Sequence, residues 1–263
     1  MTRPAFIRFG RETCGELAQA ERREWWLGNG RGGYAAGTVA GTLTRRYHGL
    51  LIASLRPPVA RTLMVAQLGA LARYRNRQYD LVCNEFADGT VHPRGYLQIE
   101  SFALDGRIPT WRFALGDALL EQRIFMAQGS NTTYVEFRLP RAAQPVGLEL
   151  RPLCALRDYH WQQRGQRDFA LESLDGGVRI AEPGSTPDSG PAYRVLAEQG
   201  EFEAAPEWHW NFRHRAESAR GLDDLEDLFD DLRCEAHRRL VQQHHGGIGH
   251  QRTSDCAHLL LAA

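Results

Sequence analysis

The sequence contains no lysine: all 32 of its basic residues are arginine, and they stand against 32 acidic residues. The absence of lysine excludes Schiff-base chemistry, lysine nucleophiles and the phosphate-binding lysine of P-loop enzymes. A net charge of zero also differs from that of a dedicated nucleic-acid-binding domain, which is strongly basic. We therefore expect no nucleic-acid partner and none of these lysine-dependent reactions.

Long apolar runs are missing as well, and no stretch approaches the roughly 18–20 apolar residues that cross a membrane. Residues 1–23 are charged and contain no apolar core of the kind that a secretory signal carries. The five cysteines are scattered along the chain, which is typical of reduced thiols rather than of a disulfide framework. These absences favour a cytoplasmic protein with no membrane partner.

Catalytic and cofactor motifs are also scarce. The sequence has no G-x-S-x-G nucleophile elbow. Gly28–Gly33 matches the pattern G-x-G-x-x-G, but a dinucleotide site needs a helix after it and an acidic residue about 20 positions on. Here the chain continues with a glycine-rich stretch, and the next carboxylate is Asp80. We predict a tight turn beside a sheet and no cofactor.

The sequence does contain a series of short segments in which apolar and polar residues alternate. Turn residues such as Asp105-Gly106 and Gly129-Ser-Asn131 separate them. The clearest are Gly49–Leu55, Thr62–Leu71, Tyr96–Phe102, Trp111–Leu115, Leu119–Met126, Thr132–Leu139, Val146–Leu150, Val178–Ala181 and Ala192–Leu196. Alternation with a period of two and regular turns is typical of an antiparallel sandwich. We predict an all-β domain over residues 1–229.

The last part of the chain has a different pattern. Leu222, Leu225, Leu228 and Leu232 recur at helical spacing, which predicts a short amphipathic helix. Residues 230–263 are predicted to be a divergent tail, helical at first, then His-rich and disordered. The cysteines and histidines of the tail are zinc-ligand types, but their spacing is looser than that of closed zinc sites, so we expect no metal.

Charge is unevenly distributed along the chain. Residues 25–79 contain eight arginines and no carboxylate, and residues 221–232 contain six carboxylates and no arginine. The first stretch could attract phosphates, which leaves open a module that binds polyanions or single-stranded nucleic acid. The second is interpreted as a solvated face or as a set of partners for arginine.

Aromatic and polar side chains gather at a few places. These are Trp25-Trp26, Thr44–Gly49, Tyr159–Trp161 and Trp208–Phe212. Such mixtures can bind sugars, because a ring face stacks on the sugar while polar groups bond its hydroxyls. The tryptophans could equally fill a sandwich core, where large aromatic side chains are common.

These same segments resemble the opening of the bacterial and archaeal glycogen debranching enzymes. The resemblance is carried by Glu24–Gly41, by Thr44-Arg-Arg-Tyr-His-Gly-Leu-Leu51, by Pro57-Pro58 with Arg61, and by Trp210–Leu228. It covers residues 20–229. The family has an N-terminal β-supersandwich of this size followed by a glucoamylase-like (α/α)6 barrel, which holds the acid and base for α-1,6 hydrolysis.

The resemblance implies a domain that binds glucan or supports the active site, and whose partners are glycogen or an α-glucan oligosaccharide and the catalytic (α/α)6 barrel. Arg45, Arg46, Tyr47 and His48 would shape the sugar site or brace the barrel. Trp210 and Asn211 are weaker candidates for stacking and hydroxyl bonding. The segments Thr44–Gly49 and Trp208–Arg220 are expected to meet.

The chain departs from the family pattern after Phe229. We expect that it stops before the barrel, as a natural short form or through an altered reading frame near residue 230, and that alone it does not hydrolyse glucans. A complete small sugar-active sandwich enzyme is the other alternative. It would need two convergent carboxylates or a His–carboxylate pair in one pocket.

Overall fold

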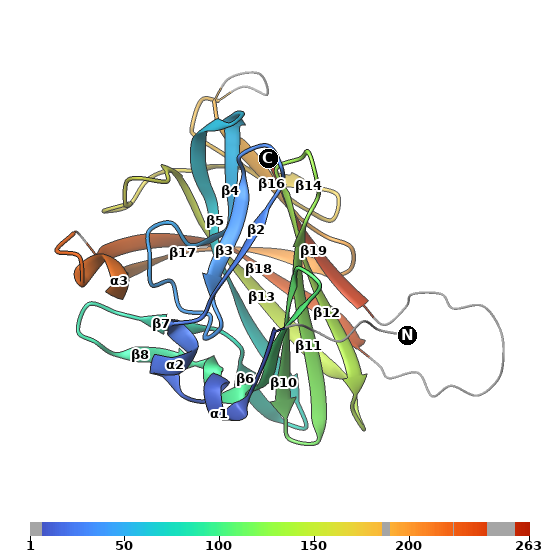
Figure 1. Ribbon diagram of the computed structural model, residues 1–263. Coiled ribbons are helices and arrows are strands. Elements are labelled where there is room, and N and C mark those ends of the chain that lie inside the picture. Colours follow the sequence, from blue (N-terminus) through green and yellow to red (C-terminus); the bar gives the residue numbers. More distant parts are fainter. Residues whose placement is uncertain (1–6, 186–189, 223, 241–255) are drawn as a thin grey trace.

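The computed structural model describes residues 7–185, 190–222, 224–240 and 256–263. Over these residues the chain forms two large antiparallel sheets that pack face to face, with a two-stranded hairpin and short helices at one side (Figure 1). The predicted all-β antiparallel sandwich is confirmed.

The larger sheet has nine strands in the described part of the chain. In spatial order they are β1 (Ile7–Gly10), β9 (Ile99–Asp105), β10 (Ile108–Leu115), β11 (Ala118–Met126), β12 (Thr132–Arg141), β19 (Cys256–Ala262), β16 (Ala192–Ala197), β15 (Gly177–Ala181) and β14 (Ala170–Leu174). Gly106, Gly116 and Gly129 have positive φ at the turns that join β9 to β12, which suits glycine and explains why these segments were predictable.

The smaller sheet has eight strands in the same described ranges. Their order is β17 (Glu201–Arg213), β18 (Leu225–Leu240), β13 (Val146–Asp158), β5 (Val59–Tyr74), β4 (Gly49–Arg56), β3 (Tyr34–Thr38) and β2 (Glu24–Gly28), with β6 (Arg77–Asp80) paired to β5. The separate hairpin consists of β7 (Cys83–Glu85) and β8 (Val91–Arg94). The helices are α1 (Arg11–Cys14), α2 (Leu17–Glu21) and α3 (Arg215–Ser218), with a 3-10 turn at Gly95–Gln98.

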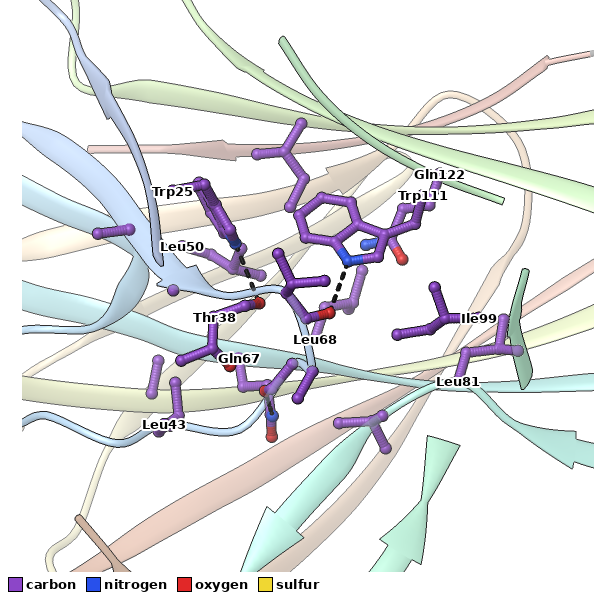
Figure 2. A pocket seen from close by; sticks show the side chains of 18 of the residues that line it. Trp25, Thr38, Leu43, Leu50, Gln67, Leu68, Leu81, Ile99, Trp111 and Gln122 are labelled. Carbon is purple, nitrogen blue, oxygen red and sulfur yellow. Dashed lines mark hydrogen bonds between the residues drawn. The ribbon is translucent and has the colours of Figure 1, made fainter. Parts of the chain in front are cut away.

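The main core lies between the two sheets. Trp25 of β2 and Trp111 of β10 meet there edge to face, with ring centroids 5.6 Å apart. The indole N–H of Trp25 donates to the Thr38 carbonyl at 3.2 Å, and that of Trp111 donates to the Val39 carbonyl at 2.9 Å (Figure 2). The two side chains line an internal cavity of about 70 Å³. Trp25 is therefore a core residue.

A second apolar cluster lies on the opposite face of the smaller sheet. Because side chains alternate along a strand, Ala35, Leu51 and Cys154 belong to the main core, and their neighbours Tyr34, Ile52 and Leu153 belong to this second cluster. We call this side the outer face. The hairpin β7–β8 and α3 lie on the same side of the molecule (Figure 1).

The glycine-rich motif forms the turn between β2 and β3, as predicted. Asn29 is fully buried there. Its side-chain oxygen accepts from the backbone N–H groups of Arg31 and Gly33, at 2.8 and 3.0 Å. Its amide nitrogen donates to the Ser130 carbonyl and to Asn131 Oδ1, both at 3.0 Å. The motif therefore ties the turn of one sheet to the other sheet.

The predicted C-terminal helix is wrong. Residues from Leu225 to Leu240 form β18, which pairs with β17 on one side and with β13 on the other. Ladder pairing on both sides outweighs the helical spacing of the leucines, since tertiary context overrides local propensity. The expected domain boundary at residue 229 falls inside this strand.

The predicted tail is also wrong where the structure describes it. Cys256–Ala262 forms β19, which lies between β12 and β16 in the larger sheet. Leu259 and Leu261 are buried in the main core, and Leu260 between them faces outward, as strand alternation requires. The His-rich residues 241–255 lie outside the described residues.

Candidate functional site

The loop at residues 44–48 meets α3, as the sequence predicted. The backbone N–H of Ala216 donates to the Thr44 carbonyl at 2.9 Å. A ring nitrogen of His214, Nδ1, lies 3.0 Å from the Leu43 carbonyl. These bonds join two segments far apart in sequence on the outer face.

The two arginines of this loop are held by carboxylates of the same domain. Arg46 donates to Glu217 Oε2 at 3.2 Å and to the His160 carbonyl at 3.0 Å. Arg45 donates to Glu24 at 2.7 Å. Glu217 is fully buried, so the pair with Arg46 is part of the packing between the loop and α3.

His48 is buried and holds the loop at residues 44–48 in place through hydrogen bonds of its ring. Its Nδ1 accepts from the backbone N–H of Thr44 at 3.2 Å, and its Nε2 lies 3.5 Å from Glu24 Oε1. Burial lowers the pKa of His48, which favours the neutral ring. The pKa of Glu24 is lowered to about 2, because it accepts hydrogen bonds from His48 and Arg45. His48 therefore has a positioning role, with its ring out of reach of a ligand.

A buried charged cluster supports the loop from the sheet. Arg157 of β13 forms a bidentate pair with Glu226 of β18, and His214 Nε2 lies 2.9 Å from Glu226 Oε2. Arg157 also donates to the Arg46 carbonyl at 3.0 Å. Burial alone would raise the pKa of Glu226, but Arg157 and His214 overcome it and lower the pKa to about 2. A bidentate arginine–carboxylate pair fixes geometry strongly, so the backbone of the loop is rigidly placed.

Above this cluster lie five rings that we call the aromatic row: the pair Trp26 and Tyr34, and the group Tyr47, Tyr159 and His160, which one hydrogen bond joins to the pair. Trp26 stacks on Tyr34 with centroids 3.8 Å apart, and the Tyr34 hydroxyl donates to the Tyr47 carbonyl at 3.0 Å. Tyr47 meets Tyr159 edge to face at 5.4 Å, and Tyr159 lies 4.1 Å from His160. Trp26 is 61% exposed.

Two arginines lie over rings of the aromatic row. The guanidinium of Arg46 lies 5.6 Å from the Tyr47 ring, and that of Arg61 lies 5.5 Å from the Tyr159 ring. Arg61 also donates to the Tyr159 hydroxyl at 3.3 Å. The row thus presents exposed ring faces beside fixed hydrogen-bond donors.

A family model described as glycogen debranching enzyme N terminal matches residues 23–237. The chain belongs to this family. The match begins beside Glu24, includes the aromatic row and ends within β18, so it includes every element that builds the site. No curated protein matches the chain.

Two predicted residues of this debranching-enzyme domain have contacts other than with the aromatic row. Trp210 is 45% exposed and stacks on Trp208, with centroids 5.6 Å apart. Asn211 adopts a positive φ of 63°, and its backbone N–H donates to Asp227 Oδ1 at 2.8 Å. Asn211 therefore shapes a bend in β17, while Trp210 remains an exposed ring at a different place.

The carboxylates of residues 221–232 were expected to pair with arginines. Asp224 pairs with Arg213 at 3.1 Å, and Glu226 pairs with Arg157, as predicted. Asp227 instead binds the backbone N–H groups of Asn211 and Gly165. Asp223 lies outside the described residues.

Folding pairs four of the eight arginines of residues 25–79 with carboxylates. Carboxylates from elsewhere in the chain pair with Arg45, Arg46, Arg73 and Arg75, and Arg31 and Arg61 donate to backbone carbonyls. Residues 25–79 contain no carboxylate, but in the folded domain carboxylates from other segments lie beside their arginines. This pairing disfavours the polyanion-binding alternative.

Two His–carboxylate pairs bear on the alternative of a complete enzyme. His214 and Glu226 are at least 99% buried, and Glu226 is bound to Arg157, so a substrate does not reach them. In the second pair His48 is buried, while Glu24 is 40% exposed and is held by Arg45. Within the described residues, no group of three potential ligands is placed to hold a metal ion, and no helix is long and apolar enough to cross a membrane. The side chains of the cysteines and histidines of the tail, from Cys234 to His258, which were considered as zinc ligands and not expected to bind metal, lie outside the described part.

Of the aromatic row, the sequence assigned only Tyr47 to the site; Trp26, Tyr159 and His160 were noted as aromatic clusters without a role, and Tyr34 and the supporting pair of Arg157 and Glu226 were missed. Trp26 was grouped with Trp25, although neighbouring residues of a strand point to opposite faces and one of the two had to face outward. Tyr34 lies inside the motif Glu24–Gly41 but was given no role there, and Arg157 lies in a segment that carried no motif. Strand alternation could have identified Trp26, whereas the Arg157–Glu226 pair joins residues 69 positions apart and needs the fold.

Proposed function

We propose that this domain binds α-glucan along the aromatic row and supports the active site of a debranching enzyme, whose catalytic carboxylates come from an (α/α)6 barrel domain. The observation that carries the proposal is the aromatic row itself, with Trp26 exposed and Arg46 and Arg61 fixed over two of its rings. Its chemistry suits a sugar, because ring faces pack on the apolar face of a pyranose and guanidinium groups donate to its hydroxyls.

The arrangement favours binding over chemistry. Of the carboxylates beneath the row, Glu217 and Glu226 are fully buried and paired with arginine. Glu24 is bound to Arg45 and His48. Hydrolysis of a glycosidic bond needs an acid and a second carboxylate about 5–9.5 Å apart on either side of the bond. We therefore expect that the purified chain releases no glucose from a limit dextrin, and detectable release would contradict this.

Binding is tested by affinity electrophoresis in gels that contain glycogen. The wild-type chain should be retarded, and Trp26→Ala should weaken retardation by roughly tenfold in apparent affinity, the equivalent of about 1.4 kcal/mol. Phe125→Ala is the matched control, because Phe125 is a partly exposed ring that stacks on Tyr134 in the larger sheet. Equal retardation of Trp26→Ala and the wild type would refute the role of the row.

The same gels separate the two exposed tryptophans. Trp210→Ala should migrate like the wild type if the aromatic row is the binding site, since Trp210 stacks on Trp208 away from the row. Loss of retardation in Trp210→Ala alone would move the site to β17.

A further inference from the structure

A cavity of about 310 Å³ lies on the outer face, between the hairpin β7–β8 and the smaller sheet. Its walls come from β5, β13 and β17 on the sheet side and from the hairpin on the other. None of the rings of the aromatic row lines it. The volume is at the lower end of the roughly 300–1,000 Å³ that is usual for small-molecule sites.

Gly69 lies in the floor of the cavity. This residue is the single glycine among the 16 residues of β5, and it lies directly opposite Arg151 of β13. Its neighbours Leu68 and Ala70 face the main core, so position 69 faces the cavity. Glycine inside a strand often marks a close approach by a ligand or by another backbone. A Cβ added at position 69 would lie 3.2 Å from the carbonyl oxygen of Arg151 and 3.4 Å from its Cβ, so a larger side chain would crowd the floor of the cavity.

The charges around the cavity compensate one another. Glu149 is buried and paired with Arg73 and with Arg151, whose Nε donates to it at 2.8 Å. Glu149 with two arginines leaves one positive charge, which the carboxylate of Asp80, also in the lining, offsets, so little net charge remains for a charged ligand to complement. Asn84, 8% exposed, lines the cavity, and its Oδ1 has no hydrogen-bond partner among the described residues. A buried polar atom of this kind is suited to a neutral donor.

Two rings give the cavity an apolar wall. Phe86, at the end of β7, and Phe212, of β17, lie 5.3 Å apart and line it together. An isolated β-bridge also joins these two residues, and Glu85 beside Phe86 pairs with Arg213 and Arg215. The hairpin wall is therefore anchored to the sheet, and the cavity is preformed.

We propose that this cavity is a second sugar site, which takes a mono- or disaccharide unit with its apolar face on Phe86 and Phe212 and a hydroxyl donating to Asn84 Oδ1. The lining selects a neutral polyhydroxylated ligand. The choice of an α-glucan unit within that class rests on the proposed function. Two separate sites would let the domain hold two segments of a branched polymer.

The test uses maltose as the probe and saturation-transfer NMR and calorimetry as the measurements, in the Trp26→Ala background, which weakens binding at the aromatic row. Maltose should still bind. Adding Gly69→Val should weaken its affinity at least tenfold by filling the cavity. Asn84→Ala should weaken it by roughly two- to tenfold, the effect of one hydrogen bond. Gly147→Val is the matched control, since Gly147 lies on β13 outside the cavity, with the Arg73 Cβ 3.8 Å from an added Cβ.

The outcomes separate the two sites. Loss of all maltose binding in Trp26→Ala overturns the cavity site and leaves the aromatic row intact as a proposal. Unchanged maltose affinity after Gly69→Val, in a variant with a wild-type melting temperature, also overturns the cavity site. If Gly69→Val unfolds the domain, Asn84→Ala is the deciding variant. An affinity for maltose equal to that of the Trp26→Ala parent then refutes the proposal.

Discussion

Asn29 uses its whole side chain to hold the two sheets together at one end. Its oxygen accepts two hydrogen bonds and its nitrogen donates two, all in a buried environment. A buried amide with every group satisfied is costly to remove, because its partners lose their hydrogen bonds without gaining water. The hydrogen bonds of Asn29 therefore account for the glycine-rich motif as a structural turn, and no bound nucleotide is needed to explain it.

Asn29→Ala should lower the free energy of unfolding by about 2–4 kcal/mol, since up to four buried groups lose a partner. Urea unfolding followed by tryptophan fluorescence measures the change. Gln78→Ala, an exposed amide on β6, is the control and should stay within about 0.5 kcal/mol of the wild type. A change of similar size in both variants would show that the buried amide has no special role.

Glu226 makes part of the stability of the domain dependent on pH. Its pKa is lowered from 4.5 to about 2 in the folded state, so the folded state holds the proton less tightly than the unfolded chain does. The contribution of Glu226 to stability is then complete above pH 4.5 and is lost as the pH falls toward 2.

Glu226→Gln should cost about 3–5 kcal/mol at pH 7, because it leaves Arg157 buried without its counter-charge. The difference between this variant and the wild type should shrink at pH 2.5, where the wild-type carboxylate is itself being protonated. Urea unfolding at both pH values checks this, with the exposed Glu100→Gln as the control. A difference that stays constant with pH would contradict the assignment.

Strand β19 is the element that was hardest to predict from the sequence. Its leucines follow a His-rich stretch, and nothing local indicates that they enter the middle of a sheet. Leu259 and Leu261 are buried in the core, whereas Leu260 is on the outer side of the larger sheet. Neighbouring leucines of one strand therefore have different environments.

Leu261→Ala should destabilise the domain by about 2–5 kcal/mol, the usual cost of removing a buried leucine side chain. Leu260→Ala should cost less than half as much, because its side chain is partly exposed. Thermal unfolding of the two variants gives the comparison. Equal effects would place β19 outside the core and contradict the register.

The elements that could be predicted were those whose pattern lies in residues adjacent in the sequence. Strands β9 to β12 were found because alternation and tight turns are properties of neighbouring residues. Strand β18 was mistaken for a helix, because leucines three and four apart fit the period of a helix and the pairing with β13 and β17 that overrode this pattern depends on the fold. The loop at 44–48 and its contact with α3 were predicted from a family motif, while the ring partners of Tyr47 depend on the fold.

At the scale of the molecule, the arginine-rich stretch and the carboxylates elsewhere in the chain compensate each other. The pairs Arg46–Glu217 and Arg73–Glu149 join residues 171 and 76 positions apart. A protein with compensated charge should not bind a polyanion by counterion release, and its sugar binding should depend weakly on salt.

Retardation by glycogen should therefore change less than twofold between about 0.05 and 0.5 M salt, whereas binding to nucleic acid falls by orders of magnitude over such a range. Affinity gels at both concentrations, with single-stranded DNA as the competitor, test this. Displacement of the protein by DNA at low salt, reversed at high salt, would favour the polyanion alternative instead.

The place of β19 in the larger sheet has a consequence for the order of events during synthesis. Strand β19 separates β12 from β16, so residues 132–141 and 192–197 find their common neighbour only when residues 256–262 have been made. Contacts between residues so far apart in sequence are slow to form. As the chain emerges from the ribosome, the β9–β12 meander and the β14–β16 unit therefore form separately, each with an unpaired edge strand. The last of the described strands then joins them into one sheet.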